Sequence, residues 1–101
     1  MSEQTLPQKG QKEIKINLPT SLVGGVYCNF LNVSHTREEF IMDFIMVHGG
    51  VGIVTSRVIM SPGHMKRTVL ALQGNLKKYE DNIGKIQEAP QPKGKLGFHT
   101  P

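Results

Sequence analysis

One cysteine and four histidines are the residues of this chain best suited to nucleophilic or metal chemistry. A cysteine nucleophile needs a neighbouring base, and His35 is the histidine nearest to Cys28 in the sequence. Cys28 alternates with Val26 and Phe30, however, which is typical of an inert thiol on a strand face. The histidines lack metal-ligand spacing such as HxxxH. The sequence therefore predicts no catalytic residue, no metal site and no cofactor.

Two further motifs resemble functional sites but have simpler explanations. Glu38 and Glu39 are adjacent, so on a strand they point to opposite faces and cannot act as a catalytic carboxylate pair. The HGGVG motif at residues 48–52 joins two expected strands, whereas a phosphate-binding glycine loop leads from a strand into a helix. We interpret both motifs as turns.

The start of the expected helix is the strongest candidate for a small binding site. Ser61 is placed to cap the helix and Pro62 occupies its first position. Free N–H groups there, next to two cations, could bind a phosphate or a carboxylate, but ordinary capping is the favoured interpretation. Two lysines farther along extend this basic surface. The candidate binding residues are Ser61, His64, Lys66, Arg67, Lys77 and Lys78.

Length and composition limit the class of protein. The 101 residues suffice for one small domain, and a net charge of +4 permits a nucleic-acid partner without requiring one. A single cysteine favours a reducing compartment, and no signal peptide or apolar run of about 18 residues is present. We expect a cytoplasmic protein with no membrane contact.

Hydrophobic periodicity predicts four strands followed by one long helix. The central stretch, residues 40–47, is apolar except at Asp43, so both of its faces should be covered. The other strands are expected at residues 13–18, 26–34 and 53–60. The helix carries apolar residues spaced alternately by four and three, a single stripe along one side: Met65, Val69, Leu72, Leu76, Tyr79 and Ile83.

The expected pairing of the last two strands predicts an ion pair. If Val47 lies opposite Ile53, Asp43 lies opposite Arg57, the only charge of one strand facing the only charge of the other. The helix stripe can cover one face of the sheet. The other face then exposes a set of apolar residues that need a partner, which predicts a homodimer or a higher oligomer; this interface includes Cys28, Phe30, Ile41 and Ile45. The alternative is that the helix stripe itself pairs between subunits.

The two ends of the chain lack the residues needed to form a core. Residues 1–12 are expected to be a flexible arm, residues 13–86 a single domain and residues 87–101 a flexible tail. Within the tail, Leu96 and Phe98 are the apolar residues that something could capture.

Several segments together resemble a known family. INLP, VYCNFLNVSHTREEFIMDF, SRVIMSPGHMKR and ALQGNLKKYE are similar, in order and spacing, to the bacterial family catalogued as domain of unknown function number 3467. The resemblance implies one folded unit and no particular activity. Gly63 stands where such proteins are expected to have Glu. The order of elements is also similar to that of the SecB export chaperones, an analogy of architecture only.

These observations predict an α+β protein with a four-stranded, mainly antiparallel sheet and one long C-terminal helix. We expect a non-catalytic binding protein that forms a homo-oligomer and binds an unidentified protein partner. The competing class is an RNA- or ribosome-associated protein. It would contact phosphates through its basic arms and through a basic ridge on the helix, formed by Lys66, Arg67, Lys77 and Lys78. A SecB-like chaperone or export adaptor is the second alternative. Purification at two salt concentrations separates the first two, because phosphate-driven capture weakens steeply with salt.

Overall fold

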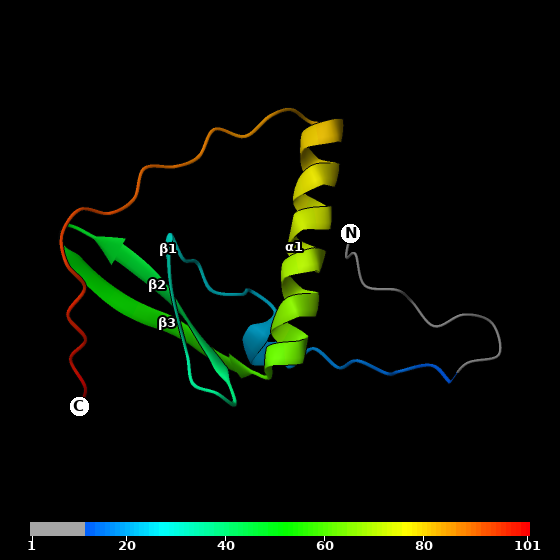
Figure 1. The fold of residues 1–101 in the computed structure, drawn as a ribbon, viewed down its shortest axis with the longest axis horizontal. Helices are drawn as coiled ribbons and strands as arrows, with labels where there is room; N and C mark the ends of the chain where they lie inside the picture. The colour runs from blue at the N-terminus through cyan, green and yellow to red at the C-terminus, as the bar shows by residue number, and fades with distance from the viewer. Residues whose placement is uncertain (1–11) are drawn as a thin grey trace.

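A computed structural model describes residues 12–101, and the predicted flexible arm lies outside the described residues except for Lys12. A short 3₁₀ turn, η1 (Thr20–Leu22), precedes a sheet of three strands and a single α-helix (Figure 1). The elements that follow η1 are β1 (Phe30–His35), β2 (Phe40–His48), β3 (Val51–Met60) and α1 (Pro62–Asn82). The α+β class and the antiparallel sheet followed by one helix are confirmed.

The sheet is a meander in the order β1-β2-β3, with every neighbour antiparallel. At the β2–β3 turn, His48 pairs with Val51, and Gly49 and Gly50 form the turn with φ of 60° and 80°. Positive φ at both central residues is the geometry of a two-residue hairpin turn and favours glycine. The glycines of HGGVG are therefore explained by the turn, as the sequence predicts.

A β-bulge separates the correct part of the predicted register from the wrong part. Asp43 lies opposite Arg57 as expected, but Val47 lies opposite Gly52 and not opposite Ile53. The register shifts after Phe44, which leaves Thr55 as the extra residue of β3. The Thr55 hydroxyl donates a hydrogen bond to the Phe44 carbonyl over 3.0 Å, so the bulge has its own side-chain contact.

The expected first strand is absent from the described residues. Residues 13–18 alternate apolar and polar side chains but form no ladder, and Ile16 is 88% exposed. Periodicity makes a segment suitable for a strand, but a strand also needs a neighbour to complete its hydrogen bonds. The prediction of a four-stranded sheet is therefore wrong for this chain in isolation, whose sheet has three strands.

The expected second strand also begins later than predicted, at Phe30. Just before it, the side-chain amide of Asn29 pairs with the backbone of Val47: Nδ2 donates to the carbonyl and Oδ1 accepts from the N–H, both over 2.9 Å. The Asn29 N–H donates to the Ile45 carbonyl over 3.0 Å. The Asn29 side chain thus takes the place of the next backbone hydrogen-bonded pair, and β1 begins only after it, at Phe30.

The helix begins where the sequence indicates but lies elsewhere than expected. The Ser61 hydroxyl accepts a hydrogen bond from the His64 N–H and Pro62 is the first helical residue. Because α1 follows β3 without a loop, it continues away from the strand end and stands apart from the sheet (Figure 1). The expectation that the helix covers a sheet face is therefore wrong.

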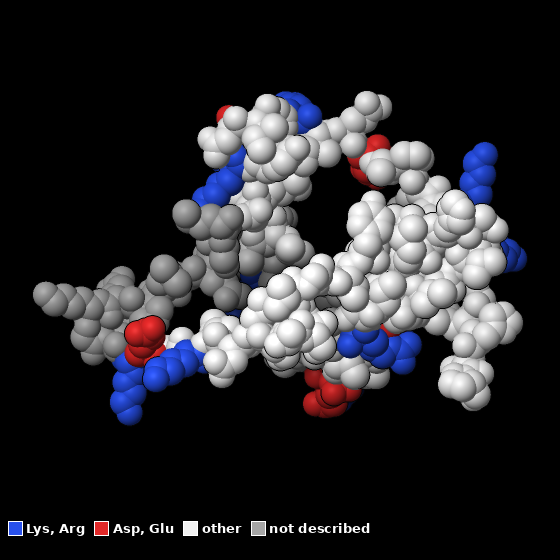
Figure 2. Space-filling view, turned by 180° about the vertical axis from the view of Figure 1, so that it is seen from behind, with Lys and Arg blue, Asp and Glu red and all other residues white. Residues whose placement is uncertain are grey.

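Little of the described chain is buried. Met42, Asp43 and Ile45, all in β2, are its buried core residues, and no residue of α1 is buried. Figure 2 shows open space between the helix and the sheet. The radius of gyration is 16.7 Å, against about 13 Å for a compact domain of this length. The fold thus leaves apolar surface on the helix without a cover.

Candidate functional site

The sheet contains an ion pair between a buried carboxylate, Asp43, and a largely exposed guanidinium, Arg57. Arg57 Nε and Nη2 donate to the two carboxylate oxygens over 2.6 Å and 2.9 Å. The Asp43 side chain is 5% exposed and that of Arg57 57% exposed. The hydrogen bonds from Arg57 lower the pKa of Asp43, burial opposes this and the Arg57 charge adds to it. Both carboxylate oxygens are occupied, so the arrangement is structural.

Cys28 and His35 do not come together. Cys28 lies before β1 and is partly buried, whereas His35 is the last residue of that strand. An extended chain places them roughly 20 Å apart. The His35 ring instead lies 5.5 Å from the Phe40 ring, centroid to centroid. Within residues 12–101, no three His, Cys, Asp or Glu side chains are grouped to hold a metal ion.

The start of α1 is largely satisfied by its own residues. The His64 N–H donates to the Ser61 hydroxyl over 3.2 Å and the Met65 N–H to the Ser61 carbonyl over 2.9 Å. Pro62 has no N–H to offer. Arg67 Nη2 lies 2.8 Å from His64 Nδ1. Capping therefore accounts for this turn, as the sequence favours, and anion binding here stays a hypothesis.

The basic residues of α1 lie opposite its apolar stripe. At about 100° per residue, the four cations fall on one side of the helix, and the stripe that runs from Met65 to Ile83 falls on the other. Arg67 and Lys77 are roughly 15 Å apart along the axis, so the ridge is a row and not one pocket. Lys77 pairs with Asp81 over 2.6 Å. The ridge residues are Lys66, Arg67, Lys77 and Lys78.

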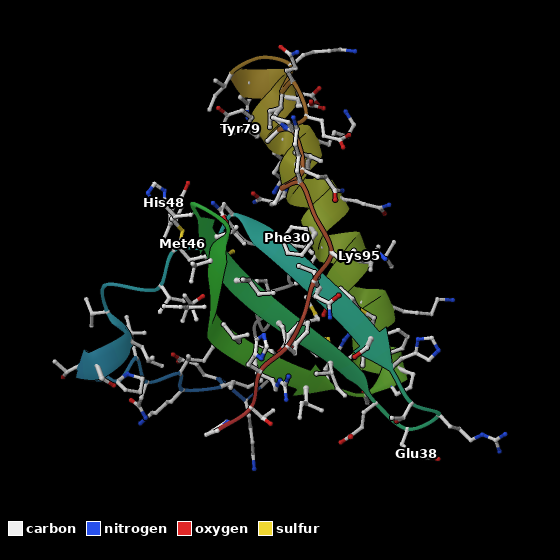
Figure 3. All side chains as sticks on the ribbon, turned by 90° about the vertical axis from the view of Figure 1, so that its left-hand side faces the viewer. Phe30, Glu38, Met46, His48, Tyr79 and Lys95 are labelled. Carbon is white, nitrogen blue, oxygen red and sulfur yellow. The ribbon has the colours of Figure 1, made fainter. Side chains whose placement is uncertain are left out.

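The sheet face predicted as an oligomer interface is partly covered by the chain itself. Phe30, Ile45 and Val54 form one row across the three strands. The C-terminal tail, residues 91–99, passes over this row and lines with it a partly open cavity of about 440 Å³. Figure 3 shows the tail crossing the sheet, with Lys95 near Phe30. Ile41 lies on the same face, opposite Ser34 and Ile59, outside the cavity.

Sequence reasoning overlooks two contributors to this cavity. Gly52 belongs to a motif explained by its turn, yet it also lines the cavity floor. The tail carries a composition typical of flexible chain, and its pair Leu96 and Phe98 is the only signal of docking. The tail forms no helix or strand, and its flexibility stays a prediction.

The fold is that of a small α+β protein with an antiparallel sheet and one C-terminal helix. The model of the family described as "Protein of unknown function (DUF3467)" matches residues 1–88, and the chain belongs to that family. The match includes every strand and the helix and ends before the part of the tail that lines the cavity. No curated protein and no solved structure matches the chain. Of the helices in residues 12–101, none is long and apolar enough to cross a membrane.

Proposed function

We propose that the protein is a non-catalytic homo-oligomer that binds another protein, and that its copies pair through α1. The observation that carries this proposal is the exposed stripe of the helix. Val69, Leu72, Leu76, Tyr79 and Ile83 are between 44% and 71% exposed. Helices in proteins derive most of their stability from packing an apolar face, and among residues 12–101 no segment buries any residue of α1.

The spacing of the stripe favours a second helix as its cover. Apolar residues that alternate by four and three form the seam of paired helices, in which each side chain inserts between those of the partner. The basic ridge lies on the opposite side and stays in solvent when two stripes meet. The tail over Phe30 and Ile45 is the reason to assign the interface to the helix in preference to the sheet face.

Two leucines of α1 provide a matched test. Leu72 lies in the stripe and is 61% exposed, whereas Leu70 lies on the side of the basic ridge and is 66% exposed. Leu72→Glu should dissociate the oligomer in sedimentation velocity, and Leu70→Glu should leave it assembled. Equal behaviour of the two variants would show that α1 does not pair through its stripe.

The basic ridge supports nucleic-acid contact as a second candidate function. Its four cations share one side of the helix, which suits a row of phosphates. Purification of the tagged full chain at low and at moderate salt tests this function. RNA that co-purifies at low salt only, and less with Lys66→Glu, would favour it over protein binding.

A further inference from the structure

We propose that the sheet face beneath the tail is a binding site for an extended segment of a partner protein that carries two apolar side chains two residues apart. The chain's own tail occupies this site and yields to the partner. The proposal rests on the proposed function, since it names the class of partner and the place where it binds.

The floor of the site is apolar, and two of its residues are glycines without side chains. It consists of the row Phe30, Ile45 and Val54, extended by Val47 and two glycines. A Cβ atom added at Gly52 would lie 3.3 Å from Ile45 Cγ2 and 3.4 Å from Val47 Cγ2. The missing side chain therefore leaves room above these methyl groups. None of the six floor residues is charged, so the floor selects apolar groups.

The tail shows what kind of ligand this floor accepts. Residues 91–99 line the cavity without forming a helix or a strand. Leu96 and Phe98 are two residues apart, and side chains at that spacing point to the same side of an extended chain. They are 48% and 50% exposed, so about half of each is covered. An extended peptide with this spacing fits the same surface.

The tail is held weakly enough to be displaced. Within the described residues, no hydrogen bond joins residues 87–101 to the sheet. The cavity of about 440 Å³ stays open between tail and floor, within the range of about 300–1,000 Å³ typical of ligand pockets. Because about half of each anchor stays exposed, the tail leaves apolar area that a partner with larger side chains covers better.

Competition between the tail and a free peptide tests the site in the full chain. The probe is a fluorescein-labelled synthetic peptide with the sequence of residues 91–101, QPKGKLGFHTP. The protein is the chain with Leu96→Ser and Phe98→Ser, which removes the anchors of the resident tail. We expect fluorescence anisotropy to show binding to this variant about tenfold tighter than to the wild type, because a tethered tail competes at millimolar effective concentration.

Three comparisons complete the experiment. The same peptide with Ser at both anchor positions should not bind. A Gly/Ser peptide with only Leu and Phe, two residues apart, should bind the variant, and its failure would overturn the partner class. Gly52→Val, added to the variant, should weaken binding about tenfold while its circular dichroism stays unchanged. Equal binding of the labelled peptide to wild type and variant, or binding to neither, would overturn the site. Sedimentation of the same samples tests pairing through α1 separately.

Discussion

Replacement of Asp43 by Asn tests whether the ion pair with Arg57 stabilises the sheet. The substitution keeps the shape of the side chain and removes the charge that accepts two hydrogen bonds from Arg57. Hydrogen bonds to a charged group contribute about 1.5–3 kcal/mol. Because the Asp43 side chain is only 5% exposed, water has little access to the carboxylate side of these bonds. We expect the free energy of unfolding to fall by about 1.5–3 kcal/mol at neutral pH.

Urea unfolding followed by circular dichroism measures this loss. With a urea dependence of about 1–3 kcal/mol per molar for small proteins, the midpoint should fall by roughly 1 M. The protein concentration must be the same in all samples, since assembly adds to apparent stability. Asp81→Asn is the matched control: its pair with Lys77 has side chains that are 61% and 75% exposed, so the midpoint should not move.

The pH dependence provides an independent check on the same pair. Arg57 holds the pKa of Asp43 below its ordinary value of 3.8, so the folded state favours the ionised carboxylate. That stabilisation is fully present above the unfolded pKa and is lost as the pH falls through the folded pKa. The difference between wild type and Asp43→Asn should therefore be constant near neutral pH and shrink below about pH 3.8. Equal midpoints at pH 7, or a difference that grows in acid, would refute the reasoning.

Two further predictions concern the ends of elements. Ser61→Ala removes the hydroxyl that accepts from the His64 N–H and should lower stability by about 0.5–2 kcal/mol in the same urea assay; an unchanged midpoint would mean that another group caps α1. Asn29→Ala removes the acceptor of the Val47 N–H and should accelerate hydrogen exchange of that amide while the Met42 amide, inside β2, stays protected; unchanged exchange at Val47 would show that Asn29 does not extend the ladder.

Local signals in the sequence predict the central hairpin and the helix well. Asp43 and Arg57 are the lone charges of two facing strands, so their pairing follows from the cost of burying the Asp43 carboxylate alone. Ser61 and Pro62 mark the helix start through capping chemistry. The bulge at Thr55 has no comparable signal, because any residue can be the extra one. Because of this bulge, Val47 pairs with Gly52, one residue before the expected Ile53.

Non-local relations explain what the sequence could not predict. The alternation in residues 13–18 indicates a strand but does not supply the neighbour that a strand needs. The stripe of α1 identifies its apolar face but not the direction in which the helix leaves the sheet. That direction follows from the connection between Met60 and Pro62, which has no loop. The cavity forms between Phe30 and Phe98, which are distant in the sequence, so no local motif marks it.

Sedimentation equilibrium of the wild-type chain at micromolar concentration tests the central claim, that copies of this protein pair through an otherwise uncovered helix. A single chain has a mass of 11.2 kDa. The account predicts at least twice that mass, and a shift toward the single-chain mass when Leu72 is replaced by Glu. A wild-type mass of 11.2 kDa would contradict it, because the stripe of α1 would then stay exposed to water in the native protein.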